Sequence, residues 1–254
     1  LRDDDVAQEH GPVGPPVRTE RAIQEHEALV RIAAVPGDEE LGGVREADDR
    51  AGRLAKIERV IAGATDPSIV RRYLVSRGLG TVPSVLLGHP ALPYYDSNRF
   101  LGRFPAVVAP ILGPDGTLQS VHRIYIGEGL PARKKTMTPV DTVNGAAVRL
   151  FEAGEALGVA EGVETAIAAH ELCGLPVWAA LTANGVETFS PPDDIRSLHI
   201  YADHDRNFTG QKSAHVLAHR LARTIPDIDV LVPPEPGDWL DVLNKRATNI
   251  ARSA

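Results

Sequence analysis

Short uninterrupted apolar runs recur in the last third of the chain, with more polar residues between them. The three runs are residues 156–160, 198–202 and 228–232. Continuous apolar runs of about five residues are typical of strands that are buried on both faces of a sheet. The alanine-rich residues 163–173, between the first two runs, predict a helix. This alternation predicts an α/β fold with a parallel sheet and flanking helices.

Carboxylates follow each of these three runs. Glu161 comes directly after the first, Asp203 and Asp205 after the second, and Asp238 a few positions after the third. In an open parallel sheet the ligand crevice lies at the carboxyl ends of the strands, so we expect these side chains to converge. Converging carboxylates favour a cation, and hard oxygen ligands suit Mg²⁺ or Mn²⁺ held together with phosphate oxygens and water. Asp203 and Asp205 alternate along extended backbone and are expected to point the same way, as co-ligands.

The pattern upstream is different. Residues 118–126 alternate, and with the apolar residues 106–112 and the turn signal at 113–116 they predict an antiparallel hairpin. The prolines in residues 89–95 predict a broken loop. Helices are predicted over residues 19–34, 51–62 and 67–78.

Charge divides the chain into three segments. Residues 1–50 hold 13 acidic and 6 basic residues (−7), residues 51–150 hold 6 and 13 (+7), and residues 151–254 hold 15 and 8 (−7). A basic segment beside an acidic cation site is what a nucleic-acid enzyme needs, since one binds phosphates and the other holds metal ions. The alternative is that these charges form only solvated faces.

Composition narrows the class of protein. The chain has 254 residues, enough for one large domain or two small ones, and its single cysteine, Cys173, excludes an internal disulfide or a zinc-ribbon ligand set. It has no apolar run near the length of a membrane span and no visible signal peptide, so we expect a cytoplasmic protein without a membrane partner. Because the first residue is Leu1 rather than Met, we expect a piece of a longer protein.

The acidic motifs, in their order, resemble those of the Toprim domain, which bacterial-type primases, topoisomerases, OLD-type nucleases and RecR proteins share. The resemblance covers about residues 150–246 and rests on Glu-Gly at 161–162, Asp-x-Asp at 203–205, Gly210 opening a helix, and Gly-Asp-Trp at 237–239. The last motif, and Tyr-Leu-x-x-Arg-Gly at residues 73–78, are similar to those of phage, plasmid and mobile-element primases.

This resemblance implies three parts. Residues 1–50 are expected to be an acidic linker and helical lead-in, residues 51–150 a smaller basic α+β subdomain, and residues 151–254 a Toprim domain with a Rossmann-like parallel sheet.

The implied activity is that of a DNA primase core, a metal-dependent nucleotidyltransferase that uses nucleoside triphosphates on a single-stranded DNA template. A helicase or other replication domains, in the same or another chain, are the expected partners. By the resemblance Glu161, Asp203 and Asp205 are catalytic, and together with Asp238 they hold the metal. The alternative for Glu161 is a first-turn acid favoured by the helix dipole. Glu164, one turn further on, is expected to be such a first-turn acid rather than a ligand.

Seven further residues are candidates for contacts with nucleic acid or nucleotide. They are Arg123, Arg133, Lys134, Lys135, Arg149, Asn184 and Arg206. Residues 133–135 form a basic cluster in an expected loop, and the alternative is a solvated loop tip. Arg123 has the alternative of an exposed strand residue.

Two other functions compete with the primase. An OLD-type nuclease uses similar carboxylates to cut a phosphodiester with water, and a degenerate Toprim domain would serve only as a DNA-binding or assembly module. A topoisomerase is disfavoured, because none of the five tyrosines stands in the context of a nucleophile and the chain is short.

Overall fold

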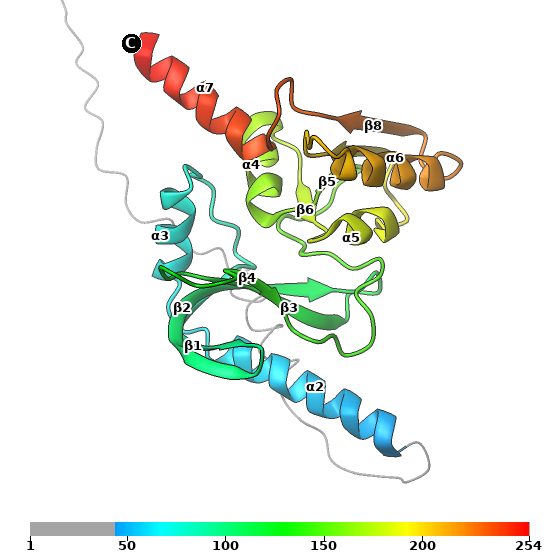
Figure 1. Cartoon of the computed structure of the whole chain (residues 1–254). Coiled ribbons are helices and arrows are strands. Elements are labelled where there is room, and N and C mark those ends of the chain that lie inside the picture. Colours follow the sequence, from blue (N-terminus) through cyan, green and yellow to red (C-terminus); the bar gives the residue numbers. More distant parts are fainter. Residues whose placement is uncertain (1–43, 254) are drawn as a thin grey trace, which may run out of the picture.

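The part of the chain that the structure describes forms two four-stranded sheets, which residues 137–155 connect (Figure 1). It is known from a computed structural model that describes residues 44–253. The predicted helix over residues 19–34, and most of the expected acidic linker, lie outside the described residues.

The first sheet is antiparallel, with its strands in chain order, and within residues 44–253 two helices precede it. The strands are β1 (Leu87–Asp96), β2 (Arg99–Leu112), β3 (Leu118–Tyr125) and β4 (Lys134–Thr136), and the helices are α2 (Val44–Ala62) and α3 (Ser68–Ser76). The predicted hairpin is confirmed as β2 and β3, with Pro110 opposite Val121.

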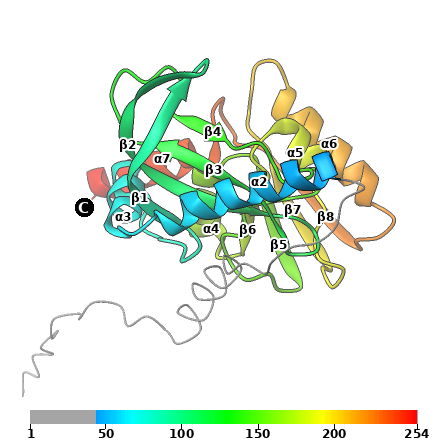
Figure 2. The ribbon, with the colours of Figure 1, turned by 90° about the horizontal axis from the view of Figure 1, so that it is seen from below.

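Side-chain alternation divides this sheet into two apolar faces. Ala106 and Val108 of β2 face a cluster that Ile57 and Ile61 of α2 complete, so α2 covers this face (Figure 2). The intervening β2 residues enter a second cluster on the other face. The sheet is therefore buried on both sides, although its strands alternate.

Two predictions for this region are wrong. Residues 89–95, expected to be a proline-broken loop, belong to β1. Pro90 and Pro93 are tolerated because β1 is an edge strand, and its register with β2 shifts between His89 and Leu92. The basic cluster also leaves the expected loop at Lys134, which begins β4.

The second sheet is parallel, as predicted, and its strand order is β6-β5-β7-β8. Its strands are β5 (Ala156–Ala160), β6 (Val177–Ala179), β7 (Ser197–Tyr201) and β8 (Asp227–Leu231). The helices between and after them are α4 (Val163–Cys173), α5 (Ala183–Thr188), α6 (Thr209–Leu221) and α7 (Trp239–Ser253).

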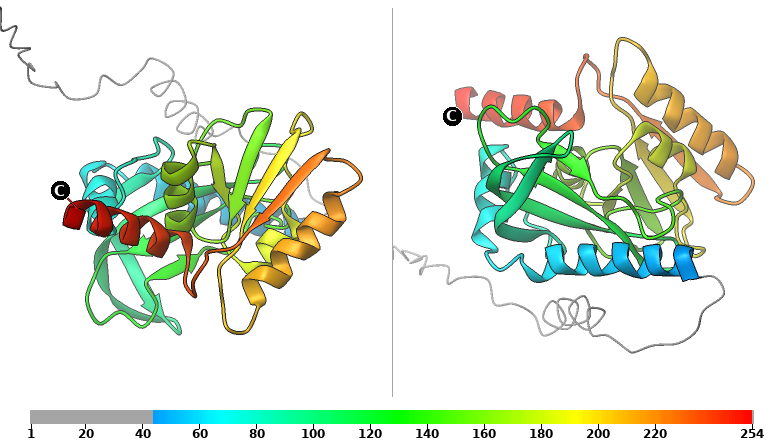
Figure 3. Two further views of the ribbon diagram at one scale, coloured as in Figure 1. Left: turned by 90° about the horizontal axis from the view of Figure 1, so that it is seen from above. Right: turned by 60° about the horizontal axis from the view of Figure 1, so that its bottom comes forward.

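The strand order reverses direction at the centre of the parallel sheet. From β5 the chain crosses through α4 to β6 on one side, whereas from β7 it crosses through α6 to β8 on the other. Right-handed crossovers in opposite directions place α4 and α6 on opposite faces (Figure 3, left). The carboxyl ends of β5 and β7 therefore form a topological switch point, where ligands bind in this class of sheet.

One hydrophobic cluster spans both sheets. It contains Val107 and Ile124 of the antiparallel sheet, Ala166 and Ile167 of α4, and Leu240 of α7. A backbone bridge between Val148 and Ala179, with hydrogen bonds of 2.8 and 3.1 Å, joins the connecting segment to β6. The antiparallel sheet is thus held between α2 and α4. None of the helices within residues 44–253 is long and apolar enough to cross a bilayer.

Because the cluster is shared, a cavity in it is expected to destabilise both sheets together. Ile167→Ala, at a side chain with 0% exposure, should lower the free energy of unfolding by about 2–5 kcal/mol. Urea unfolding followed by circular dichroism and by tryptophan fluorescence should show one shifted transition. The control Val75→Ala, at a side chain with 60% exposure, should change stability by less than about 0.5 kcal/mol. Two separate transitions would contradict a shared core.

Candidate active site

The structure brings the predicted acidic residues to the switch point of the parallel sheet. Glu161 directly follows β5, and Asp203 and Asp205 follow β7, the strand paired with β5. Asp238 approaches from the segment after β8, because a backbone bridge joins His204 to Gly237 with N–H to O distances of 2.9 and 3.3 Å. Three separate segments therefore deliver carboxylates to one edge.

Gly210 allows the Asp-x-Asp loop to pack against the start of α6. A Cβ at this position would lie 3.0 Å from both the backbone N and O of Asp203, so a larger residue would displace the loop. The backbone N–H of Gly210 also donates to Oδ2 of Asp205 at 3.3 Å. The glycine that the sequence analysis singled out is thus needed for the position of both aspartates.

The carboxylates repel one another. Burial, together with Asp238, Glu161 and Asp205, raises the pKa of Asp203 to about 7. Burial and the charge of Asp205 also raise the pKa of Glu161. Oδ1 of Asp203 is buried, and no described residue donates a hydrogen bond to it. An anionic Asp203 is therefore under-compensated by the protein alone.

These properties fit a divalent cation, which would supply the missing positive charge and a partner for the orphaned oxygen. Among the described residues, no three acidic, histidine or cysteine side chains are already arranged to hold a metal ion. The donor set is chemically suitable for such an ion, because all four side chains offer carboxylate oxygens.

Asp238 has a second task, because it caps α7. Its Oδ1 accepts from the backbone N–H of Asp241 at 2.9 Å, and Oδ2 of Asp241 accepts from the N–H of Asp238 at 3.2 Å. This reciprocal arrangement satisfies two donors at the helix start. It fixes one oxygen of Asp238, while the negative charge still acts on Asp203.

Lys134 is the cation of the basic subdomain that faces this acidic edge. Its positive charge lowers the pKa of both Glu161 and Asp203, against the larger effect of burial. Its Nζ lies 2.8 Å from Oε2 of Glu164. The antiparallel sheet thus presents a partly exposed lysine, Lys134 of β4, to the carboxylates of the parallel sheet.

Glu164, read from the sequence as an ordinary first-turn acid, is almost fully buried, with 4% exposure. Its Oε1 accepts from the hydroxyl of Tyr73 at 2.5 Å. Burial alone would raise the pKa of Glu164, but the ion pair with Lys134 and the two hydrogen bonds outweigh it and lower that pKa. Tyr73 belongs to the Tyr-Leu-x-x-Arg-Gly motif, but the motif alone did not predict this contact.

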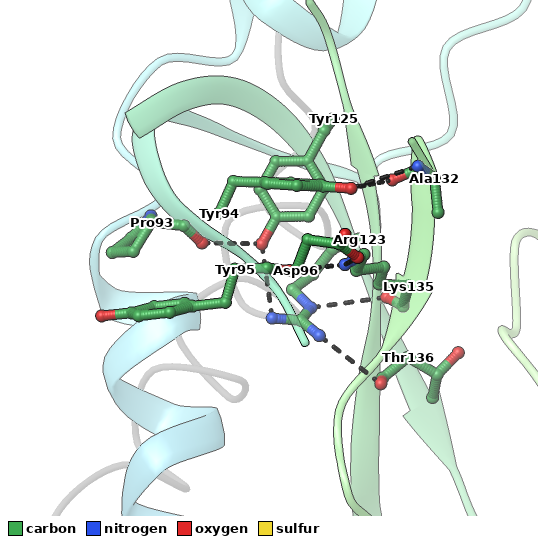
Figure 4. A network of polar contacts seen from close by, with 9 residues as sticks. All are labelled: Pro93, Tyr94, Tyr95, Asp96, Arg123, Tyr125, Ala132, Lys135 and Thr136. Atoms are coloured by element: carbon green, nitrogen blue, oxygen red, sulfur yellow. Dashed lines mark hydrogen bonds and ion pairs between the residues drawn. The ribbon is translucent and has the colours of Figure 1, made fainter. Parts of the chain in front are cut away.

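Strand alternation puts Lys135 and Arg123 on the face of the sheet opposite to Lys134. Figure 4 shows the contacts that these two cations make there. The Lys135 ammonium lies over the ring of Tyr94, 4.3 Å from its centroid, and pairs with Asp96 at 3.7 Å. Arg123 donates to the hydroxyl of Tyr125 at 3.3 Å and to two carbonyl groups of β4. Both cations hold strands of the antiparallel sheet together on the α2 side.

The remaining candidates lie apart from one another. Arg149 donates to the carbonyls of residues 113 and 114 and lies 4.9 Å from the ring centroid of Trp178, so it holds the β2–β3 turn. Asn184, at the start of α5, donates weakly to Asn144 at 3.4 Å. Arg206 is exposed beside Asp205, and Arg133 is exposed beside β4. The structure brings neither Arg149 nor Asn184 into contact with the carboxylates.

Two family models match this chain. Residues 156–249 match the Toprim domain, and residues 48–150 match a domain of unknown function (DUF7146). The Toprim domain expected from the acidic motifs is therefore confirmed for the parallel sheet.

Solved structures with a similar fold include three primases. The DnaG catalytic core has a TM-score of 0.53 at 16% identity, over 80% of this chain and 78% of that one. The zinc-binding and RNA polymerase domains of the Aquifex aeolicus primase have a TM-score of 0.53 at 17% identity, over 92% and 65%. The E. coli primase catalytic core has a TM-score of 0.50 at 16% identity, over 70% and 69%. The fold of this chain, an antiparallel sheet followed by a Toprim sheet, is thus that of primase catalytic cores.

Neutralising Asp203 is expected to stabilise the metal-free protein at high pH. Its pKa of about 7 in the fold exceeds the ordinary value of 3.8, so its ionisation opposes folding. That penalty is absent below the ordinary pKa, grows as the pH rises from the ordinary pKa to the folded pKa, and is complete above the folded pKa. Asp203→Asn should therefore raise the free energy of unfolding by about 1–2 kcal/mol at pH 8 in chelator, with a smaller gain at pH 4.5.

Urea unfolding at the two pH values measures this difference. The matched control is Asp194→Asn, at an exposed carboxylate of the same domain, which should leave stability nearly unchanged at both. A destabilised Asp203→Asn protein at pH 8 would show that the charge is compensated within the chain.

Proposed function

We propose that this chain is the catalytic core of a DNA primase, which makes short primers on single-stranded DNA by metal-dependent nucleotidyl transfer. The observation that carries the proposal is the under-compensated carboxylate edge, with Asp203 at its centre, which Lys134 of a basic subdomain faces. The likeness in fold to primase catalytic cores supports it.

The acidic residues have distinct roles in this proposal. Glu161, Asp203 and Asp205 hold Mg²⁺ or Mn²⁺, and Asp238 adds a further ligand from the α7 cap. When bound, the ion neutralises triphosphate oxygens and polarises the attacking hydroxyl. Glu161, whose pKa is raised by burial and by the charge of Asp205, is suited to accept a proton.

The reaction joins two nucleotides. The 3′-hydroxyl oxygen of one attacks the α-phosphorus of the next, a new P–O bond forms, and the bond to the departing pyrophosphate breaks. Glu161 accepts the hydroxyl proton. Lys134 binds the triphosphate, and the rigid strand ends fix the distance between the reacting groups.

The basic subdomain binds the template in this proposal. Arg133 and Arg206 are exposed, stand next to Lys134 and Asp205 in the sequence, and contact phosphates in this proposal. Four other candidates act further from the reacting groups. Arg123 and Lys135 hold the antiparallel sheet in shape, and Arg149 and Asn184 lie at the edge beside β6.

We also propose the wider setting of this activity. We place the domain boundary near residue 150, which the family matches to residues 48–150 and 156–249 support. The Tyr-Leu-x-x-Arg-Gly and Gly-Asp-Trp motifs favour the phage, plasmid and mobile-element type of primase. A helicase or another replication domain remains the predicted partner.

Primer synthesis tests the function directly. Labelled nucleoside triphosphates, a single-stranded DNA template and Mg²⁺ or Mn²⁺ should give short labelled oligomers with the wild-type protein. The Asp203→Ala/Asp205→Ala variant should give none. Glu161→Gln should lower the rate by roughly 100-fold or more, since it removes the proton acceptor.

Other outcomes would redirect the proposal. Cutting of the template without synthesis, lost in the same double variant, would identify a Toprim nuclease. DNA binding with neither activity would identify a non-catalytic module. Exposed Asp194→Asn serves as the control for nonspecific effects of charge.

A further inference from the structure

Glu164 is a buried acid for which the proposed chemistry has no use. It lies in the first turn of α4, three residues after Glu161, and is 4% exposed. Burying a carboxylate costs free energy unless it is paired and hydrogen-bonded. A residue that served only to fill space here would be apolar, so the charge itself requires an explanation.

Both partners of Glu164 come from the other subdomain. Tyr73 reaches it from α3 at 2.5 Å, and Lys134 reaches it from β4 at 2.8 Å. These partners are 91 and 30 positions away in the sequence. With Tyr73 bound to Oε1 and Lys134 to Oε2, each carboxylate oxygen has its own donor, and the orientation of the carboxylate is set.

The fixed Glu164 carboxylate restricts the position of the Lys134 side chain. A lysine side chain is long and flexible, and it must lose rotamer freedom to bind a ligand. Here one of its three N–H donors is bound to Glu164, while its side chain is still 50% exposed. The ammonium is also close enough to lower the pKa of Glu161 and Asp203. The ammonium is therefore held beside the carboxylates, and its other N–H donors remain available to a ligand.

We propose that Glu164, oriented by Tyr73, is a positioning residue that fixes the Lys134 ammonium at the carboxylate edge, ready to bind the triphosphate of a nucleoside triphosphate. This positioning role rests on the proposed primase function, because Lys134 belongs to the nucleotide site of that function. Binding is favoured because the ordering of Lys134 precedes it.

The same helix provides a matched control. Glu171 of α4 also bridges the two subdomains, since its Oε1 accepts from the backbone N–H groups of Gly80 and Thr81 at 2.8 and 2.6 Å. Lys134 is not among its hydrogen-bond or ion-pair partners, and it lies two turns further along α4. A loss that reflects only the subdomain contact would appear in both glutamate variants.

The test compares Glu164→Gln, Glu171→Gln, Lys134→Ala and the double variant Glu164→Gln/Lys134→Ala. Loss of a charge-assisted hydrogen bond should raise the KM for nucleoside triphosphate about tenfold in Glu164→Gln, with a smaller change in kcat. Glu171→Gln should keep the wild-type KM. The double variant should have the KM of Lys134→Ala alone, because Glu164 acts through that lysine.

Three results would overturn the proposal: an unchanged KM in Glu164→Gln, an equal rise in Glu171→Gln, or additive effects in the double variant. Tyr73→Phe is a milder change, should Glu164→Gln fold poorly. It removes one hydrogen bond and keeps the ion pair, so its KM should rise roughly two- to fivefold. A wild-type KM in a folded Tyr73→Phe protein would overturn the role of Tyr73 in orienting Glu164.

Equilibrium binding separates this inference from the primase proposal. ATP binding in Mg²⁺, measured by calorimetry, should weaken in the same order as the KM values rise, without any requirement for synthesis. If the protein makes no primers but Glu164→Gln and Lys134→Ala weaken ATP binding non-additively, the positioning role stands and the primase proposal fails. If the protein makes primers but the two substitutions weaken ATP binding independently, the primase proposal stands and the positioning role fails.

Discussion

Mutual repulsion among the carboxylates at the ends of β5 and β7 is the constraint around which the site is arranged. The parallel sheet gathers Glu161, Asp203 and Asp205 because its strand order reverses there, and the α7 cap adds Asp238. The protein offsets only part of this charge, through Lys134. A site with surplus negative charge favours the binding of cations. The repulsion that destabilises the cation-free fold is relieved when a cation binds, and this relief contributes to the affinity.

Much of this arrangement is predictable from local patterns. Buried parallel strands appear as uninterrupted apolar runs, and the residue after such a run lies at the ligand-binding edge, so Glu161 and Asp203 were identifiable from position alone. Gly210 was identifiable from its place in the motif, opening a helix after Asp-x-Asp, and the structure adds the reason, since a Cβ there would crowd the backbone of Asp203. These features depend on short stretches of chain and on the rules of one sheet.

The remainder depends on long-range contacts, which a single sequence does not encode locally. Lys134 and Lys135 are adjacent and chemically identical, and a three-residue strand decides which of them faces the site. Glu164 has the local signature of a first-turn acid, and only the approach of Tyr73 makes it a buried ion-pair partner. β1 was obscured by prolines that an edge strand tolerates.

The cluster that joins Ile124 of β3 to Ile167 of α4 bears on how such a chain can change during evolution. The two family matches meet near residue 150, which suggests two interchangeable modules, but their facing surfaces form one interior. A Toprim domain transplanted onto an unrelated leading sheet would expose the apolar face of α4 and lose the donors to Glu164. The two sheets are therefore expected to evolve together. A substitution in the shared cluster on one side of residue 150 should be accepted only with a compensating substitution on the other side.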